Sequence, residues 1–158
     1  PCFAFATTTN TVVSGIIGEG RANEVHSAIL KILKNCLYCT IPIMILVSIF
    51  PLQMARIYTD DLNLAQLVIP SIYVICLGTI FQGIGNAYFE AVSGTGNTSA
   101  ALYLETGILV LYVAFVWGMT HYTTRVELVW LAEILYGVLL GIFCGIYIKR
   151  ANWNKKRI

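Results

Sequence analysis

Apolar residues form five long runs along this chain, separated by short polar stretches. The runs cover residues 2–17, 30–52, 62–92, 100–120 and 128–148. At about 1.5 Å per residue, each of the last two would measure about 31 Å as a helix, close to the ~30 Å hydrocarbon core of a bilayer. The pattern therefore predicts an all-α fold, a polytopic transmembrane helix bundle of about five spans.

The first run carries an unusual number of polar side chains. It starts directly after Pro1, so we expect a truncated span and a chain that is a fragment of a longer protein. Asn10 and Ser14 are four residues apart and share one side of a helix, next to the threonines between residues 7 and 11. Lipid does not suit such a face, so it should either form hydrogen bonds between helices or line a watery cavity.

The second run is preceded by residues 21–34, which have mixed charge and amphipathic spacing. We expect this segment to lie along the membrane surface before the span 30–52, which Pro42 should bend. Residues 53–63 should form a short polar connection.

The third run is too long for a simple crossing. As one helix, residues 62–92 would measure about 46 Å against a core of about 30 Å. It must therefore tilt, bend or protrude, and four residues could bend it: Pro70, Gly78, Gly83 and Gly85.

A small uncharged turn follows, Ser93-Gly94-Thr95-Gly96-Asn97-Thr98. Its two glycines can adopt positive φ, and its Ser, Thr and Asn side chains can cap helix ends. Gly94, Gly96, Asn97 and Thr98 are thus predicted to build a structural turn that joins two helices into a hairpin.

The last run has glycine at every fourth position, at Gly137, Gly141 and Gly145, which permits close helix contact. After it comes a basic tail, residues 149–158. Five alternating spans would put the following basic residues on one side of the membrane: Arg21, Lys31, Lys34, Lys149, Arg150, Lys155, Lys156 and Arg157. Only Arg56 and Arg125 would lie on the other side, so the positive-inside rule predicts a cytoplasmic turn and C-terminus.

Composition supports the membrane assignment and narrows the function. Hydrophobic residues make up 58% of the chain and charged residues only 11%. The net charge of +2 is too small to suggest nucleic acid as a partner. Cys36 and Cys39 have C-x-x-C spacing, but no second pair or nearby His completes a metal or redox site, so packing is the favoured role. Because no hydrolase, metalloprotease or phosphate-loop motif occurs, we expect no enzyme and no cofactor.

Polar groups inside the spans are the candidates for function, because each is costly in hydrocarbon unless it faces protein or water. Gln82, Asn86 and Glu90 repeat every fourth residue and form one stripe, and Glu105 should lie level with Asn86 on the next helix. Glu133 should lie nearer the opposite face, too far from Glu105 for a direct pair.

These groups have two possible roles. Glu105 and Glu133 could exchange a proton or hold a cation during transport, or could form hydrogen bonds between helices. For Glu90 we favour an interfacial carboxylate that reaches headgroup water.

One motif pair resembles a known family. Residues 10–21, a polar-lined helix closing on Gly18-Glu19-Gly20-Arg21, followed by the turn at residues 93–98, resemble the C-terminal lobe of the multidrug and toxic compound extrusion (MATE) family. This resemblance implies a twelve-helix transporter of two six-helix lobes, with the five spans here as helices eight to twelve and the N-terminal lobe missing. It also implies a bacterial inner-membrane antiporter that exports small organic cations and amphipathic compounds in exchange for Na⁺ or H⁺.

The resemblance also bears on the site residues. Several members of the family place an acid on helix ten about a dozen positions before the glycine that matches Gly94, where this chain has Gln82. An amide can coordinate a cation but cannot exchange a proton, so the coupling acid would be Glu105, Glu133 or a residue of the missing lobe. On this interpretation Asn10, Ser14, Gln82, Asn86, Glu105 and Glu133 form the substrate and ion pathway.

Two alternative functions remain. One is a lipid or polysaccharide flippase of the same superfamily, which would need a larger and more basic cavity. The other is a membrane scaffold that dimerises through the face of Gly137, Gly141 and Gly145.

Overall fold

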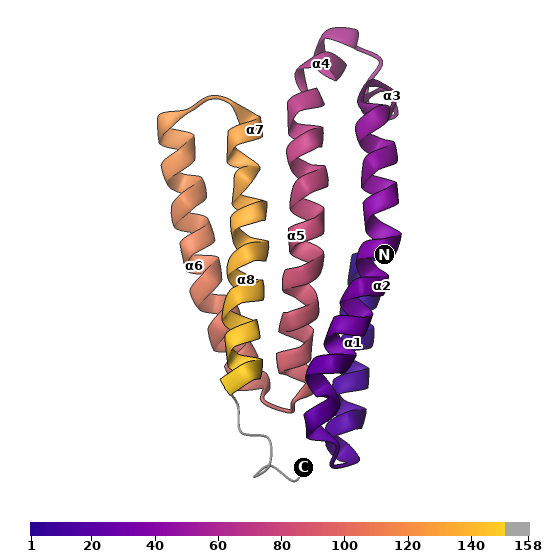
Figure 1. Ribbon diagram of the computed structural model, residues 1–158. Coiled ribbons are helices and arrows are strands. Elements are labelled where there is room, and N and C mark those ends of the chain that lie inside the picture. The colour runs from indigo at the N-terminus through magenta and orange to yellow at the C-terminus, as the bar shows by residue number, and fades with distance from the viewer. Residues whose placement is uncertain (151–158) are drawn as a thin grey trace.

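The structure of residues 1–150, a computed structural model, is a bundle of α-helices without a β-strand in that range (Figure 1). The long helices are α1 (Cys2–Gly18), α2 (Val25–Ile49), α5 (Ile69–Gly94), α6 (Thr98–Tyr122) and α8 (Leu131–Arg150). The short ones are the 3₁₀ helix η1 (Ala22–Glu24), α3 (Pro51–Arg56), α4 (Leu62–Leu67) and α7 (Val126–Val129). This arrangement confirms the predicted polytopic bundle.

Four segments of residues 1–150 are long and apolar enough to cross a bilayer: Ala22–Ile49, Ile69–Gly94, Thr98–Tyr122 and Val126–Arg150. α1 is a shorter apolar helix of 17 residues. Of the predicted basic tail, Lys149 and Arg150 form the last turn of α8, and residues 151–158 lie outside the described residues.

Helix α5 lies at the centre of the bundle. It packs against α8 on one side and against α1 and α2 on the other, while α6 covers α8 (Figure 1). The buried apolar core follows the same helices, from Val13 in α1 through Ile29 in α2 and Ala91 in α5 to Leu140 in α8. Side chains of α5 can therefore reach the four other long helices, α8, α1, α2 and α6.

The predicted surface segment at residues 21–34 is wrong. After the short η1 turn, α2 runs without interruption from Val25 to Ile49. A stripe of buried residues continues through its first turns, at Val25, Ile29, Leu33, Cys36 and Thr40. Because this spacing keeps one face against α1 and α5, the charged first turns simply extend the transmembrane helix. Pro42 lies inside α2 as expected.

The run at residues 62–92, expected to tilt, bend or protrude, divides into two helices. α4 ends at Leu67, Val68 separates the two, and Pro70 lies in the first turn of α5, where proline is well tolerated. The glycines of α5, which could bend it, do not interrupt it, since α5 is one helix from Ile69 to Gly94. Gly78, Gly83 and Gly85 are instead buried where neighbouring helices come close.

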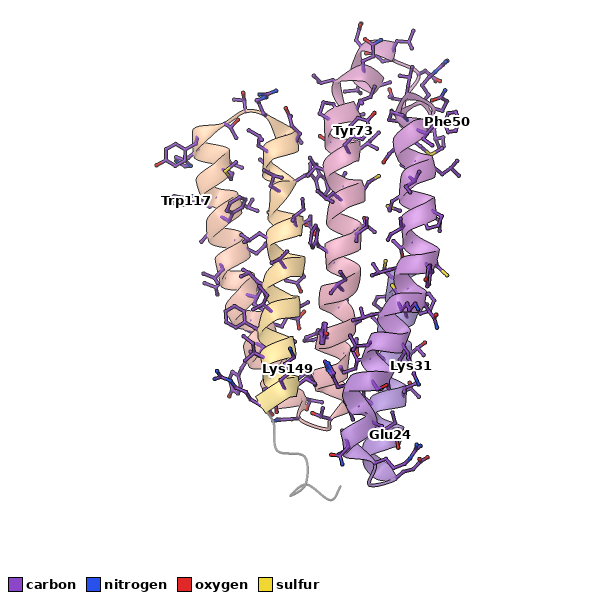
Figure 2. The ribbon with its side chains drawn as sticks, in the orientation of Figure 1. Glu24, Lys31, Phe50, Tyr73, Trp117 and Lys149 are labelled. Atoms are coloured by element: carbon purple, nitrogen blue, oxygen red, sulfur yellow. The ribbon has the colours of Figure 1, made fainter. Side chains whose placement is uncertain are left out.

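The two ends of the bundle differ. The α1–η1 connection, the α5–α6 turn and the end of α8 share one end, named here the turn end (Figure 1). The α3–α4 and α6–α7 connections share the opposite end, named the far end. Figure 2 shows Glu24, Lys31 and Lys149 near the turn end, and the exposed Phe50 and Trp117 toward the far end. The connectivity agrees with the predicted alternation of sides.

The α5–α6 turn has the predicted cap and one unexpected glycine. Gly96 has φ of 76°, and the Asn97 side chain caps α6 by accepting a hydrogen bond of 3.3 Å from the Ala100 backbone N–H. Gly94, in contrast, does not adopt positive φ but is the buried last residue of α5. It is needed for helix contact, as described below.

Candidate functional site

Glycines bring the backbones of α5 and α8 together. A Cβ added to Gly85 would lie 2.5 Å from the carbonyl oxygen of Gly137, and a Cβ on Gly137 would lie 2.6 Å from the backbone nitrogen of Gln82. Gly141 also faces Gly85, at 3.8 Å. The predicted close contact of the glycine face is therefore confirmed, and it sets the distance at which side chains of α5 and α8 meet.

The Glu133 carboxylate lies beside this contact and is held by two uncharged donors. Gln82 donates from Nε2 to one carboxylate oxygen at 2.7 Å, and the Tyr112 hydroxyl of α6 donates to the other at 2.9 Å. Three helices thus meet at one carboxylate, and all three partners are partly buried. We name Gln82, Tyr112 and Glu133 the acid cluster.

A small cavity of about 190 Å³ opens at the acid cluster. Its lining also includes Leu109 and Tyr136. The three ion pairs found within residues 1–150 involve Arg21 or Arg125 and none involves Glu90, Glu105 or Glu133. The acid cluster is therefore a carboxylate at membrane depth, beside a cavity and with neutral hydrogen-bond partners, which is the environment in which a carboxyl can exchange a proton or a cation.

Glu105 lies on the other side of Tyr136. The Tyr136 hydroxyl donates to Glu105 at 3.5 Å, a longer and weaker contact than those to Glu133. Glu105 lines a second cavity of about 360 Å³, together with residues of the turn end such as Ser93, Thr98 and Ser99. As expected, Glu105 and Glu133 do not bond directly within the described chain; each is bound to a different tyrosine.

A second carboxylate and amide pair joins α1 to α5. Asn10 donates from Nδ2 to Glu90 at 2.7 Å, and the Ser14 hydroxyl donates to the backbone carbonyl of Gly94 at 2.9 Å. A Cβ on Gly94 would lie 2.6 Å from the Asn10 carbonyl oxygen. Glu90 is therefore an interhelical acceptor beside the close approach of α1 at Gly94, a role that the sequence did not indicate, and its contact with headgroup water stays a prediction. For Asn10 and Ser14, the hydrogen-bonding alternative holds.

The remaining polar face of α1 has no covering helix among residues 1–150. Thr7, Thr8 and Thr11 are exposed, and each hydroxyl donates to the backbone carbonyl four residues earlier, at 3.0, 2.8 and 3.4 Å. Such bonds satisfy the hydroxyl groups but leave a polar surface on an intramembrane helix. This is the face for which the cavity-lining alternative stays open.

Asn86 occupies an intermediate position on α5. Because an α-helix has 3.6 residues per turn, it lies on the strip between Gln82, which faces α8, and Glu90, which faces α1. Its side chain is half-buried.

The cysteines contribute to packing. Cys36 is buried with its Sγ 3.9 Å from the Thr40 hydroxyl, whereas Cys39 is exposed, so the two side chains of the C-x-x-C motif have different environments. No group of three or more His, Cys, Asp or Glu side chains is placed to hold a metal ion in residues 1–150.

Sequence reasoning did not identify Tyr112 and Tyr136. A usable signal was present, since Tyr112 follows Glu105 by two helical turns and Tyr136 follows Glu133 by three residues, each on the same side of its helix. In an apolar run, however, a tyrosine is most often a packing residue, and only the geometry shows that both hydroxyl groups bind carboxylates.

The sequence matches the family MatE over residues 1–117. No curated protein and no solved structure matches it. The matched range includes Asn10, Gln82, Glu105 and Tyr112 but ends before α8, so it does not include Glu133 or Tyr136.

Proposed function

This chain belongs to the MatE family and is a transporter of the MATE type, and we propose that it acts as an antiporter that exports small organic cations or amphipathic compounds in exchange for Na⁺ or H⁺. The acid cluster carries this proposal. Glu133 is a carboxylate at membrane depth with two neutral donors and an adjacent cavity. A scaffold would need neither the cavity nor the carboxylate at this depth.

The residues around the two cavities favour a cationic substrate or ion over an anionic lipid. Glu105 and Glu133 each line one cavity, and no Lys or Arg lines either of them in the described chain. A flippase for anionic lipid or polysaccharide would need basic side chains at these positions. The acidic lining of these two cavities therefore supports export of cations.

We assign the role of coupling acid to Glu133. The family resemblance puts an acid on helix ten at the position of Gln82, where this chain has an amide. Gln82 is hydrogen bonded to Glu133 at 2.7 Å, so the carboxylate from α8 occupies nearly the same place in space as an acid on α5 would. On this proposal the coupling acid lies on α8 instead of α5, and the position of the site in the bundle is the same.

The uncovered polar face of α1, together with Asn86, forms one wall of the proposed substrate pathway. Thr7, Thr8 and Thr11 are exposed on a helix that is otherwise suited to the membrane interior. An N-terminal lobe would face this wall, and rocking of the two lobes would expose it to each side in turn. The turn end would be cytoplasmic, in a bacterial inner membrane, because the basic residues gather there: Arg21, Lys31, Lys34, Lys149 and Arg150.

The test uses the protein as its gene encodes it, reconstituted in liposomes, with tetraphenylphosphonium as the transported cation. Glu133→Gln should lower export by about a hundredfold or more under both pH and Na⁺ gradients, since a positioned proton-transferring group typically contributes 10²-fold to 10⁴-fold in rate. Glu127→Gln is the matched control, because Glu127 pairs with Arg125 at the far end and lines neither cavity described above. Normal export by Glu133→Gln under each gradient would disprove the assignment of Glu133.

A further inference from the structure

We propose that Glu133, Tyr136 and Glu105 form a proton path that runs through this bundle from the acid cluster to the turn end. The proposal rests on the function proposed for Glu133 and adds a second proton acceptor, Glu105, and a connecting hydroxyl, Tyr136. It assigns the coupling ion as a proton.

The two carboxylates and the two tyrosines are arranged reciprocally. α6 supplies Glu105 and Tyr112, and α8 supplies Glu133 and Tyr136. Tyr112 donates to the glutamate of α8 at 2.9 Å, and Tyr136 donates to the glutamate of α6 at 3.5 Å. The two rings meet edge to face, with centroids 5.9 Å apart and planes at 76°. The four side chains are therefore one connected group between two helices.

Tyr136 separates the two cavities. It lines the 190 Å³ cavity with Glu133, and its hydroxyl is bonded to Glu105, which lines the 360 Å³ cavity at the turn end. A water molecule occupies about 30 Å³ in the liquid, so the smaller cavity has room for a few water molecules next to Glu133. The Tyr136 hydroxyl therefore joins a residue of the smaller cavity to Glu105, which lines the cavity at the turn end.

We name Glu133, Tyr136 and Glu105 the row. The row and its neighbours extend along α6 far enough to carry a proton toward the turn end. Glu105 and Tyr112 are two turns apart on α6, about 10 Å, and Glu105 lies about another 10 Å from Thr98, where α6 begins. A hydroxyl group can accept one proton while it donates another, whereas it offers a sodium ion no such passage. The row is therefore suited to a proton.

The transfer step conserves protons and requires only water as a co-reactant. Protonated Glu133 gives its proton to a water molecule in the small cavity and becomes a carboxylate. That water passes a proton to the oxygen of Tyr136, while the original hydroxyl proton of Tyr136 moves to the Glu105 carboxylate. The net result is an ionised Glu133, a protonated Glu105 and an unchanged tyrosine, after which Glu105 releases its proton to the cavity at the turn end.

The surroundings of the row contain few other titratable groups. Tyr112 from α6 contacts Glu133, and Cys144 from α8 lies close enough to Glu105 to interact electrostatically. From α5, the facing polar group is Gln82, which does not titrate. None of the ion pairs within residues 1–150 includes a member of the row. No fixed cation among these residues therefore keeps either carboxyl ionised, so each of the two can accept the proton in turn.

The experiment uses infrared difference spectroscopy of the reconstituted protein, as its gene encodes it, on addition of tetraphenylphosphonium. The variants Glu133→Gln and Glu105→Gln assign the carboxyl band of each residue, since each removes one band. The two bands should change with opposite signs, because one carboxyl loses the proton that the other gains. Tyr136→Phe removes the hydroxyl and should slow the change of the Glu105 band by at least tenfold, whereas the Glu133 band should still be present. Tyr88→Phe is the matched control, since Tyr88 is a half-buried tyrosine of α5 that packs near Gly145, outside the row.

The outcomes separate this inference from the function on which it rests. If Glu133→Gln abolishes export but Tyr136→Phe leaves export and the Glu105 band unchanged, the row is refuted and the coupling role of Glu133 stands. If Glu133→Gln exports normally, the proposed function itself fails. Export that follows a Na⁺ gradient and ignores a pH gradient would also refute the proton path. Elution of each variant as a single folded species in detergent excludes misfolding as the cause.

Discussion

The α5–α8 and α1–α5 interfaces use the same three components in different ways. Each has a glycine that allows two backbones to touch, Gly85 against α8 and Gly94 against α1. Each has a carboxamide that donates to a carboxylate at 2.7 Å, Gln82 to Glu133 and Asn10 to Glu90. The chemistry of the pair is therefore the same at both interfaces.

The surroundings of the two pairs are different. Within residues 1–150, Glu133 has a second donor, Tyr112, and a cavity beside it, whereas Glu90 accepts from Asn10 and lies one turn from the end of α5. A cavity lets a carboxyl exchange a proton with its surroundings, and a single short bond between packed helices mainly holds the helices together. The comparison teaches that an intramembrane carboxylate is a candidate for function because of what lies beside it, and its depth alone is not enough.

The largest expected difference between the two interfaces is in transport. Glu90→Gln should keep export within about threefold of the unmodified protein, because the glutamine carbonyl still accepts from Asn10 and an interhelical hydrogen bond in a membrane averages about 0.6 kcal/mol. Glu133→Gln should lose at least about a hundredfold. Both are measured as initial rates of tetraphenylphosphonium export in liposomes. Equal losses for the two variants would show that the cavity does not distinguish the sites.

The next effect concerns the backbone contact at α5–α8. Gly85→Ala should destabilise the protein by about 1–3 kcal/mol, because its Cβ would lie 2.5 Å from the Gly137 carbonyl oxygen and the helices would have to separate. Gly107→Ala in α6 is the control, since no atom outside its own helix lies within 4 Å of an added Cβ. Unfolding in mixed detergent micelles gives both values. A Gly85→Ala protein as stable as Gly107→Ala would contradict the close packing.

Much of the fold could be predicted from periodicity and length. The long apolar runs, the break near Pro70 and the cap at Asn97 all follow from local rules that each segment obeys by itself. The surface segment at residues 21–34 could not be excluded in this way, because an amphipathic stripe looks the same whether it faces a headgroup layer or a neighbouring helix. Only the position of α1 and α5 beside α2 resolves it.

The candidate site depends on information that one sequence does not contain. Gln82, Glu105 and Glu133 could be named from their cost in hydrocarbon, but their partners could not, since Gln82 and Glu133 are 51 residues apart. The same applies to Gly94, which fits a turn by composition and serves as a contact by geometry. Residue type predicts which groups need a partner, and helix packing decides which partner each one receives.

The smallest expected effect is the difference in pairwise energy between the two carboxamide–carboxylate pairs. It sharpens the comparison most, because the pair that contributes less to transport should contribute more to stability. Double-mutant cycles on unfolding, with Asn10→Ala and Glu90→Ala in one cycle and Gln82→Ala and Glu133→Ala in the other, isolate each pairwise energy. The Asn10–Glu90 coupling should be about 0.6–1.7 kcal/mol, between the average and the maximum measured for such bonds in a membrane protein, since each side chain loses its partner when the other is removed. The Gln82–Glu133 coupling should be below about 0.6 kcal/mol, because Tyr112 still satisfies the carboxylate when Gln82 is truncated. The pair that matters less for transport would then matter more for stability. A larger coupling at Gln82–Glu133 would mean that the acid cluster is primarily a structural bond, and the distinction between the two interfaces would be lost.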